Sequence, residues 1–556
     1  MPKSKSKAPA VSAWDSAISI LTWLATCISI FSFLFLYKNG EILLYGDAVA
    51  HINIARRVFD SKTPGLLQLG TVWLPLPHLL MIPFLIPDKM WISGAGGSLP
   101  SMVAYVFAVI GMFRLVRGAL SRALPPEPPA RAAAWIAAIV FAANPNLIYM
   151  QATAMGEAIY LAFFIWSVVY LAEFARGEGR ALTKCGLCLF AACLTRYDGW
   201  FLAAAIVATV LILTVTRAKS SGTTGSRSRF HLAKFVLLSA AAPALWLAYN
   251  GIVYRNPLEF ENGPYSAKAI EHNAQAHGSP GHPGSGNLLV AGMYFVKAAE
   301  TNMAPSQGLQ RFWIFLICAA VLSLAVIPRA TRVLPKALEL WPLSFLSLPL
   351  PFYGLSIAYG GVPIFVPEWW PFAHYNVRYG LELLPAFSVA VAVVVYFLLG
   401  FRNSSPKLTP AALLVILGLG VASYVSVWSA SPVCLEEAQI NMRTRNQLER
   451  QVAEWLKRLP PDSTLLMYLG DHVGALEQAD IPLHRVINEG NHRVWKQPSD
   501  PDGLWEHALA NPAQYADYVV AFEEDPVWRA VQQQHLQELV EIHVTGQPRG
   551  VLYRAR

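Results

Sequence analysis

The residues best placed for chemistry follow the first long apolar run of the chain. In the stretch Tyr45-Gly46-Asp47-Ala48-Val49-Ala50-His51, a carboxylate and an imidazole come soon after the uncharged residues 16–36. Asp47 and His51 are four residues apart, so they share one face if the segment is helical. Two arrangements stay open for this pair. They are either joint ligands of a divalent metal ion, with His51 as a candidate metal ligand, or partners in a plain imidazole–carboxylate hydrogen bond.

Further charged residues stand at the ends of other apolar runs. Glu157 lies in AMGEAIYLAFF, Arg196 and Asp198 lie in LTRYDGWFL, and Arg378 lies beside Tyr379 in NVRYGLELLPAF. Each residue on its own is compatible with a solvated helix end. In a helical bundle they would face one cavity with paired charges, as membrane active sites usually do. The predicted cluster consists of Asp47, Glu157, Arg196, Asp198 and Arg378.

The composition of the chain indicates a polytopic membrane protein. Of its 556 residues, 54% are apolar and only 14% are charged, and the mean hydropathy is +0.39. Soluble domains are rarely so poor in charge. A net charge of +8 would indicate a nucleic-acid partner in a soluble chain, but here the basic residues form short clusters between apolar runs. Such clusters orient helices in a bilayer, so we expect a membrane and no nucleic acid as partner.

The basic clusters also predict an orientation. If every cluster is cytoplasmic, the spans alternate without conflict, the N-terminus is cytoplasmic and Asp47 lies on the outer face. The expected fold is mainly α, a polytopic bundle of about eleven spans integral to the inner or plasma membrane. The expected spans are roughly 16–36, 98–118, 131–149, 154–174, 183–197, 199–216, 232–252, 309–328, 338–358, 379–400 and 409–429.

One apolar run is left out of this count. Residues 73–87 (WLPLPHLLMIPFLIP) contain four prolines and are short for a span. Counting them would place every later basic cluster on the wrong side. We therefore predict a partly embedded helix on the outer face, in which neighbouring protein satisfies the backbone groups that proline disrupts.

The sequence changes character after residue 431. Residues 1–431 are predicted to form the membrane module, with outer loops at about 37–97, 253–308 and 359–378. Residues 432–556 are charged and predict a small extracytoplasmic α/β domain. Its expected elements are a helix over 436–459 and strands over 464–468, 518–522 and 541–553.

Nucleotide-binding motifs are absent from the sequence. There is no Walker A sequence and no G-x-G-x-x-G after a strand, so the usual phosphate cradle of nucleotide-driven enzymes is missing. The only D-x-D string, Asp500-Pro501-Asp502, is better explained as a surface turn than as a metal site.

The motifs around the predicted cluster resemble those of the GT-C superfamily of membrane glycosyltransferases. They especially resemble the branch that contains the protein O-mannosyltransferases and the lipid A aminoarabinose transferase. Asp47 after the first span, the WLPLPH segment, AMGEAIYLAFF, LTRYDGWFL and NVRYGLELLPAF carry the resemblance in order, over about residues 15–430. Two features depart from the family pattern: Ala48 stands where many relatives have a second acid, and the lysine before the proline pair is absent.

The resemblance implies a transferase that takes a sugar from a polyprenyl-phosphate carrier on the non-cytoplasmic face and inverts the anomeric centre. It implies that Asp47 is the general base. Glu157 would contact sugar, acceptor or metal, and the donor phosphate would be held by Arg196, Arg378 or His78. The acceptor is a lipid, a glycan or a protein. The substrate-binding candidates are Glu157, Arg196, Asp198, Arg378, Tyr379 and His78.

General chemistry agrees with these roles, since a carboxylate can take the proton of an attacking hydroxyl and a guanidinium can stabilise a departing phosphate. Whether a divalent metal ion serves as cofactor stays open. Two other classes compete with the transferase: a flippase or transporter of lipid-linked saccharides, and a non-catalytic envelope assembly protein. A transporter should show inverted repeats and midplane charges, which the sequence does not. Arg378 also has a purely structural alternative, a pairing with Glu368 or Glu382.

Overall fold

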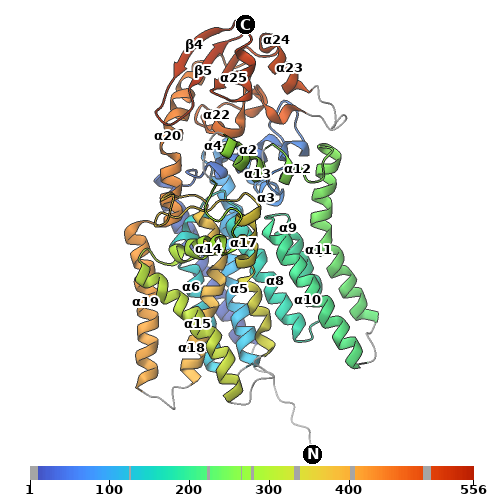
Figure 1. Ribbon diagram of the computed structural model, residues 1–556, viewed down its shortest axis with the longest axis vertical. Coiled ribbons are helices and arrows are strands. Elements are labelled where there is room, and N and C mark those ends of the chain that lie inside the picture. The colour runs from blue at the N-terminus through green and yellow to red at the C-terminus, as the bar shows by residue number, and fades with distance from the viewer. Residues whose placement is uncertain are drawn as a thin grey trace, which may run out of the picture.

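The computed structural model describes the whole chain except residues 1–10, 124–126, 222–225, 265, 277–280, 331–337, 401–406 and 493–502. The expected Asp500-Pro501-Asp502 turn lies outside the described residues. Long helices run side by side through most of the molecule, and a small sheet stands at one end of them (Figure 1). We call this end of the helical bundle the sheet end.

Nine helices of the described residues are long and apolar enough to cross a membrane. Together with the fold, this composition makes the protein an integral membrane protein. The nine are α1 (Val11–Lys38), α5 (Ala95–Ala123), α8 (Glu157–Ala175), α10 (Asp198–Ser221), α11 (Ser226–Val253), α15 (Gln307–Ala330), η2 with α17 (Leu338–Ser347, Pro349–Tyr359), η3 with α18 (Val377–Leu383, Leu384–Gly400), and α19 with α20 (Leu408–Ala430, Val433–Leu456).

A tenth span is counted if a bent pair of helices crosses as one. α6 (Glu127–Ala142) and α7 (Pro145–Gln151) meet at 62°. The bend follows from the sequence between them, because a residue before proline avoids the helical conformation. The Asn144 side chain then caps the second helix by accepting a hydrogen bond from the Leu147 N–H at 3.0 Å.

The expected count of about eleven spans is not reached among the described residues. The predicted span at 183–197 is instead α9 (Ala181–Cys193), whose 13 residues extend only about 20 Å. This is shorter than the hydrocarbon core of a bilayer, which is about 30 Å thick. The segment 253–308, which is predicted as an outer loop, is partly helical. It contains α14 (Leu288–Met303), a helix with a buried face that packs against η3 and α17.

The proline-rich segment forms a short helix, as its sequence predicts. α3 (Leu76–Leu85) is ten residues long and packs against α2 (Gly46–Arg57) and α5. The N–H of Leu76 donates to the Leu194 carbonyl at 2.9 Å, so another part of the chain satisfies a backbone group at its start. The other short helices before α14 are η1 (Leu66–Leu69), α4 (Asp88–Ile92), α12 (Glu259–Asn262) and α13 (Ala267–Ala276).

The C-terminal part contains a five-stranded sheet in the order β2-β1-β3-β5-β4. β1 (Leu465–Met467) pairs in parallel with β2 (Val486–Ile487) and β3 (Tyr518–Phe522). The expected single strand over 541–553 is a hairpin of β4 (Gln537–Ile542) and β5 (Gly550–Arg554), because a turn with Gly546 at φ 82° separates the two. The helices of the C-terminal part beyond α20 are α21 (Leu469–His472), α22 (Gly474–Gln478), η4 (Leu483–Arg485), η5 (Glu489–His492), α23 (Leu504–Ala510), α24 (Pro512–Tyr515) and α25 (Pro526–Val531).

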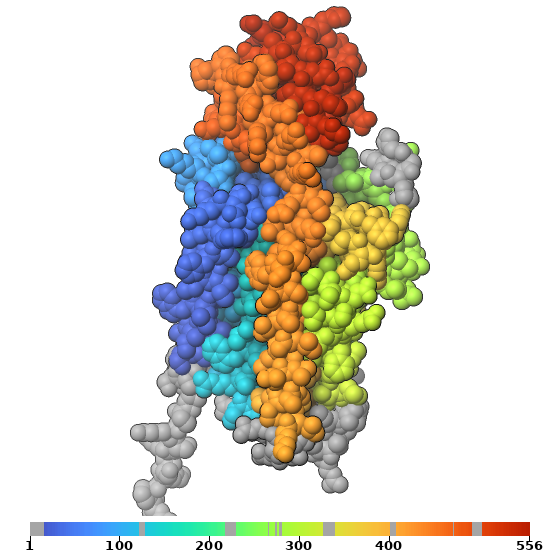
Figure 2. Space-filling view, turned by 90° about the vertical axis from the view of Figure 1, so that its left-hand side faces the viewer, coloured from blue at the N-terminus to red at the C-terminus, as the bar shows by residue number. Residues whose placement is uncertain are grey.

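α20 connects the membrane helices to the sheet. It follows α19 after a break at Ser431 and Pro432, and the two form one long column in Figure 2. The predicted domain boundary at residue 432 coincides with this break. The first turn of α20 is nevertheless buried, since the Cys434 N–H donates to the Asn146 side chain at 2.9 Å. The Cys434 carbonyl accepts from the Tyr45 hydroxyl, also at 2.9 Å. The boundary is therefore not an exposed linker.

Candidate active site

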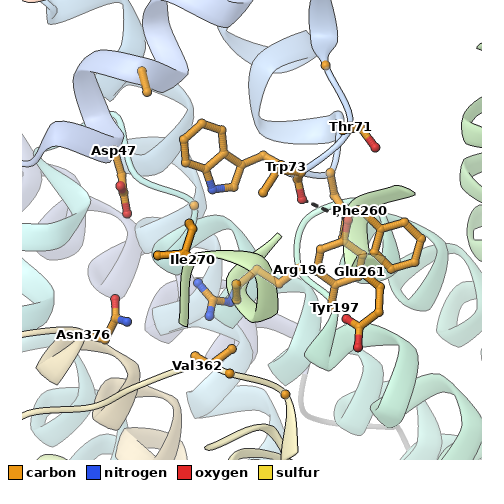
Figure 3. Close-up of a pocket in the computed structure, with 18 of the residues that line it drawn as sticks. Asp47, Thr71, Trp73, Arg196, Tyr197, Phe260, Glu261, Ile270, Val362 and Asn376 are labelled. Carbon is orange, nitrogen blue, oxygen red and sulfur yellow. Dashed lines mark hydrogen bonds between the residues drawn. The ribbon is translucent and has the colours of Figure 1, made fainter. Parts of the chain in front are cut away.

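A cavity of about 1680 Å³ lies at the sheet end of the bundle. Its walls come from α2 and the segment after it, from the first turns of α8 and α10, and from residues 352–379. Helices α12 and α13 contribute another wall, and residues of the C-terminal part such as Tyr468 and Trp505 also line it. Figure 3 shows Asp47, Trp73, Arg196 and Asn376 facing this space from different elements.

The predicted cluster converges on this cavity. Asp47, Glu157, Arg196, Asp198, Arg378 and Tyr379 all line it. Glu157 and Asp198 open α8 and α10, where the positive end of a helix dipole favours an acid. Gly199, in the first turn of α10, allows a close approach to the end of α9, because a Cβ there would stand 2.6 Å from the Ala192 backbone. The sequence thus places two carboxylates at helix starts that point to the same space.

Arg378 is the centre of the cluster. Its Nη2 lies 2.5 Å from Asp47 Oδ2, its Nε 3.1 Å from Glu157 Oε1, and its Nη1 3.1 Å from Glu437 Oε1. Three carboxylates therefore share one guanidinium in charge-assisted hydrogen bonds. Asp47 is the most accessible of the three, with 38% of its side chain exposed. Gly380 permits this placement, since a Cβ there would lie 2.5 Å from the backbone of α14.

Arg196 organises a second group of partners. Its Nε lies 3.1 Å from Asp198 Oδ2 and 3.2 Å from Glu382 Oε1, and its Nη2 donates to the Tyr353 hydroxyl at 2.7 Å. Its Nη1 lies 3.4 Å from Glu157 Oε1, the same oxygen that Arg378 contacts. Glu157 therefore joins the two guanidinium groups into one network.

Aromatic rings fill the space between the two guanidinium groups. The Tyr379 ring centre lies 4.7 Å from the Arg196 guanidinium carbon and 5.1 Å from that of Arg378. Tyr353 packs against Tyr379 at 5.3 Å between ring centres. Cations over ring faces are attracted by the ring quadrupole, so Tyr379 helps to hold both arginines in place.

The network holds more carboxylates than guanidinium groups. Five acids contact its two arginines, and two of their oxygens, Glu157 Oε2 and Glu382 Oε2, are buried without a hydrogen-bond partner among the described residues. Buried polar atoms are usually paired, so such atoms need an explanation. A cluster of this kind can accept protons or hydrogen bonds from a bound hydroxyl, and its arginines can hold an anion.

The two histidines differ from their expected roles. His51 lines the cavity, but its Nδ1 lies 2.8 Å from His78 Nε2, and its ring centre is 4.9 Å from that of Trp73. His78 is fully buried behind it and does not line the cavity, so it is not placed to hold a donor phosphate. Burial lowers the pKa of both imidazoles, that of His78 well below its ordinary value, so we describe the pair as neutral.

Neither expected arrangement of Asp47 with His51 is formed. Asp47 contacts Arg378 and His51 contacts His78. Within the part of the chain that the structure describes, no three His, Cys, Asp or Glu side chains form a group that would hold a metal ion. Among these residues, His51 therefore has no group of further ligands beside it for a divalent cation.

The structural alternative for Arg378 is also wrong in its partners. Glu368 lies 2.9 Å from Lys297, and Glu382 binds Arg196. Three residues of the network, Glu382, Glu437 and Tyr353, were not predicted as site residues. Glu382 carried a signal, an acid one helical turn after Arg378. Glu437 and Tyr353 carried none, because a glutamate in a charged segment and a tyrosine in an apolar run are common.

The fold is similar to that of two solved structures of ArnT. ArnT from Cupriavidus metallidurans, in a crystal structure with bound undecaprenyl phosphate, matches with a TM-score of 0.56 at 14% identity over 98% of this chain and 99% of that chain. Its apo structure matches with a TM-score of 0.55 at the same identity. An oligosaccharyltransferase from Archaeoglobus fulgidus also matches, with a TM-score of 0.42 at 13% identity, over 96% of this chain and 72% of that one. No protein family model and no curated protein matches the sequence.

Proposed function

We propose that the protein is a membrane glycosyltransferase. It moves a sugar from a polyprenyl-phosphate-linked donor to a lipid, glycan or protein acceptor on the outer, periplasmic face of the membrane. Asp47 acts as the general base and the anomeric centre is inverted. The observation that carries the proposal is the Asp47–Arg378 ion pair of 2.5 Å on the wall of a large cavity. The fold shared with ArnT, which was crystallised with undecaprenyl phosphate, supports a lipid-linked donor.

The size of the cavity supports two substrates at once. Small-molecule sites usually enclose about 300–1,000 Å³, and this cavity of about 1680 Å³ is larger. A phosphosugar head group and an acceptor group therefore fit together. Aromatic side chains such as Trp73, Tyr375 and Trp505 line it and offer faces on which sugar rings can stack.

The ion pair also explains how donor binding prepares the base. Arg378 Nη2 binds Asp47 in the structure. A donor phosphate that takes this edge of the guanidinium releases Asp47, the most accessible of the three carboxylates on Arg378. The freed carboxylate is then available to the acceptor. Donor binding and base activation are thus linked through one nitrogen atom.

The chemical step needs no group beyond these. The acceptor hydroxyl loses its proton to Asp47 as its oxygen forms a bond to the anomeric carbon. The bond from that carbon to the phosphate oxygen breaks on the opposite face, and its electron pair leaves with the polyprenyl phosphate. Arg378 and Arg196 stabilise the charge on the departing phosphate. Attack opposite to the leaving group gives the inverted product.

The test begins with the donor and then examines the base. Mass spectrometry of polyprenyl-phosphate species that copurify with the protein identifies the donor, and transfer of that sugar to an envelope extract of the source cell measures turnover. Asp47→Asn preserves the shape of the side chain but removes the proton acceptor. We expect turnover to fall roughly 10²–10⁴-fold, the usual contribution of a positioned acid–base group.

The matched control is Glu523→Gln, which neutralises an exposed acid of the C-terminal part. It should transfer sugar at the parental rate. An Asp47→Asn protein that melts at the parental temperature and keeps near-parental transfer would refute the role of Asp47. A copurifying long oligosaccharide with no transfer activity would instead favour a flippase.

A further inference from the structure

Glu437 belongs to α20, the helix that leads to the C-terminal sheet, yet its carboxylate lies inside the network. Only 1% of its side chain is exposed. Its Oε1 accepts hydrogen bonds from Arg378 Nη1 and from the Asn376 N–H, each at 3.1 Å. Its Oε2 accepts from the Val377 N–H at 2.8 Å. One carboxylate therefore binds both the backbone before Arg378 and the tip of the Arg378 side chain.

The backbone contact occurs at an unusual conformation. Asn376 has φ 57° and ψ 22°, in the left-handed region that residues other than glycine seldom adopt. η3 begins directly after it. Glu437 accepts from two N–H groups that would otherwise lack a partner at this helix start. Glu437 thus fixes the direction in which the segment carrying Arg378 leaves the turn.

The side-chain contact fixes the rotation of the guanidinium. Glu437 holds Nη1, Glu157 holds Nε, and only Nη2 points to the accessible Asp47. Glu157 and Asp47 line the cavity, whereas Glu437 does not. A guanidinium that is anchored on two edges loses little freedom when a ligand binds the third.

We propose that Glu437 is a positioning residue, which presents the Nη2 edge of Arg378 to the phosphate of the lipid-linked donor. This inference rests on the proposed function, in which Arg378 binds that phosphate. It assigns a part of donor recognition to the polypeptide beyond residue 431, although Glu437 touches no substrate. Glu437 also differs in role from Asp47, the proposed base, because replacing Glu437 should change the kinetic constants for the donor and not those for the acceptor.

The experiment compares three variants of the full-length protein. Glu437→Gln removes the charge and keeps the size, Glu437→Asp keeps the charge and shortens the side chain, and Glu436→Gln is the matched control. Glu436 is the neighbouring residue on the same helix, has 46% of its side chain exposed and lies 3.7 Å from His374. Binding of undecaprenyl phosphate is measured by native mass spectrometry, and the kinetics are measured with donor and acceptor varied separately.

We expect Glu437→Gln to weaken undecaprenyl phosphate binding and to lower kcat/KM for the donor roughly tenfold, the effect of losing one charge-assisted hydrogen bond. The apparent KM for the acceptor should stay unchanged. Glu437→Asp should recover part of the loss, because it restores the charge beside Arg378. Glu436→Gln should match the parental protein.

A double-mutant cycle with Arg378→Lys separates positioning from a general structural role. If Glu437 acts through Arg378, the double variant Glu437→Gln/Arg378→Lys binds the donor no more weakly than the single variant that has the lower donor affinity. Multiplicative losses would overturn the inference, as would donor and acceptor constants of Glu437→Gln equal to the parental ones. If Glu437→Gln does not fold, the cycle is run with Glu437→Asp. A parental protein that neither binds undecaprenyl phosphate nor transfers sugar refutes the proposed function instead.

Discussion

Replacement of Arg378 with lysine keeps a positive charge at the centre of the network but removes the planar fork of nitrogens. Arg378 uses three different nitrogens for Asp47, Glu157 and Glu437, at 2.5, 3.1 and 3.1 Å. A lysine ammonium is a single point on a flexible stem and cannot reproduce three contacts in fixed directions. The variant therefore tests the geometry of the site at almost constant charge.

The size of the effect follows from the contacts that are lost. A hydrogen bond to a charged group contributes about 1.5–3 kcal/mol. A lysine at this position should keep its contacts to Glu157 and Glu437, because both carboxylates are buried away from water. It should lose the contact to Asp47, which faces the cavity. Water replaces part of that lost contact, since Asp47 is 38% exposed. We expect a loss of about 1.4–2.7 kcal/mol in donor recognition, or roughly 10- to 100-fold in kcat/KM for the donor.

The assay varies the polyprenyl-phosphate sugar and the acceptor separately. The apparent KM for the acceptor should change little, because no contact of Arg378 is assigned to it. Arg114→Lys is the matched control, since Arg114 also binds a glutamate through two nitrogens, Glu173 at 3.0 and 2.6 Å, but does not line the cavity. An unchanged donor affinity at unchanged turnover in Arg378→Lys would remove Arg378 from the donor site.

Two further predictions concern the orientation of the chain and its acid stability. Cysteine or reporter probes at Lys407 and Glu523 should report opposite sides of the membrane, with Glu523 outside, because basic clusters favour the cytoplasm. Labelling of both positions from one side would refute the topology. Burial lowers the pKa of His472 to about 3 and the nearby Arg445 contributes, so the unfolded state binds a proton first as the pH falls below about 6.5. The free energy of unfolding should therefore decrease between about pH 6.5 and 3, by up to about 1.4 kcal/mol per pH unit from this group. The melting temperature of His472→Gln should fall less between pH 7 and 5 than that of the parental protein. Equal falls in the two proteins would contradict this prediction.

The convergence of the charged residues was predictable from sequence because charges are costly next to apolar helices unless they are grouped. Glu157, Asp198 and Arg378 stand at the ends of long apolar runs, where each could be solvated alone, but a helical bundle brings these ends together with their charges paired. The structure places them on the walls of one cavity. The helix in the proline-rich segment was predictable for a similar reason, since its prolines and its length exclude a regular span.

The partners within the network could not be predicted, because they depend on long-range packing. Glu437 meets Arg378 across 59 residues, and His51 meets His78 across 27. Neither separation leaves a periodic signal. α14 was missed because it follows a stretch rich in glycine and proline, and its burial against η3 and α17 outweighs that local composition. Fewer spans are counted among the described residues than the sequence predicts, because hydropathy alone does not reveal that α9 ends at Cys193.

Residues of the first loop of the chain bind residues of its last quarter. Asn53, on α2, hydrogen-bonds to Glu477 across 424 residues. Arg57 contacts Glu489 at 3.0 Å, and Asn491 binds Ser61 and Thr63. At a synthesis rate of about 5–20 residues per second, α2 waits roughly 20–85 s for Glu477 to leave the ribosome.

During that interval the helix that bears Asp47 lacks its final neighbours. A chain released before residue 477 carries every span but an unfinished site. A partly made copy in the membrane therefore lacks the cavity wall that residues beyond 477, such as Glu489 and Trp505, supply in the finished chain.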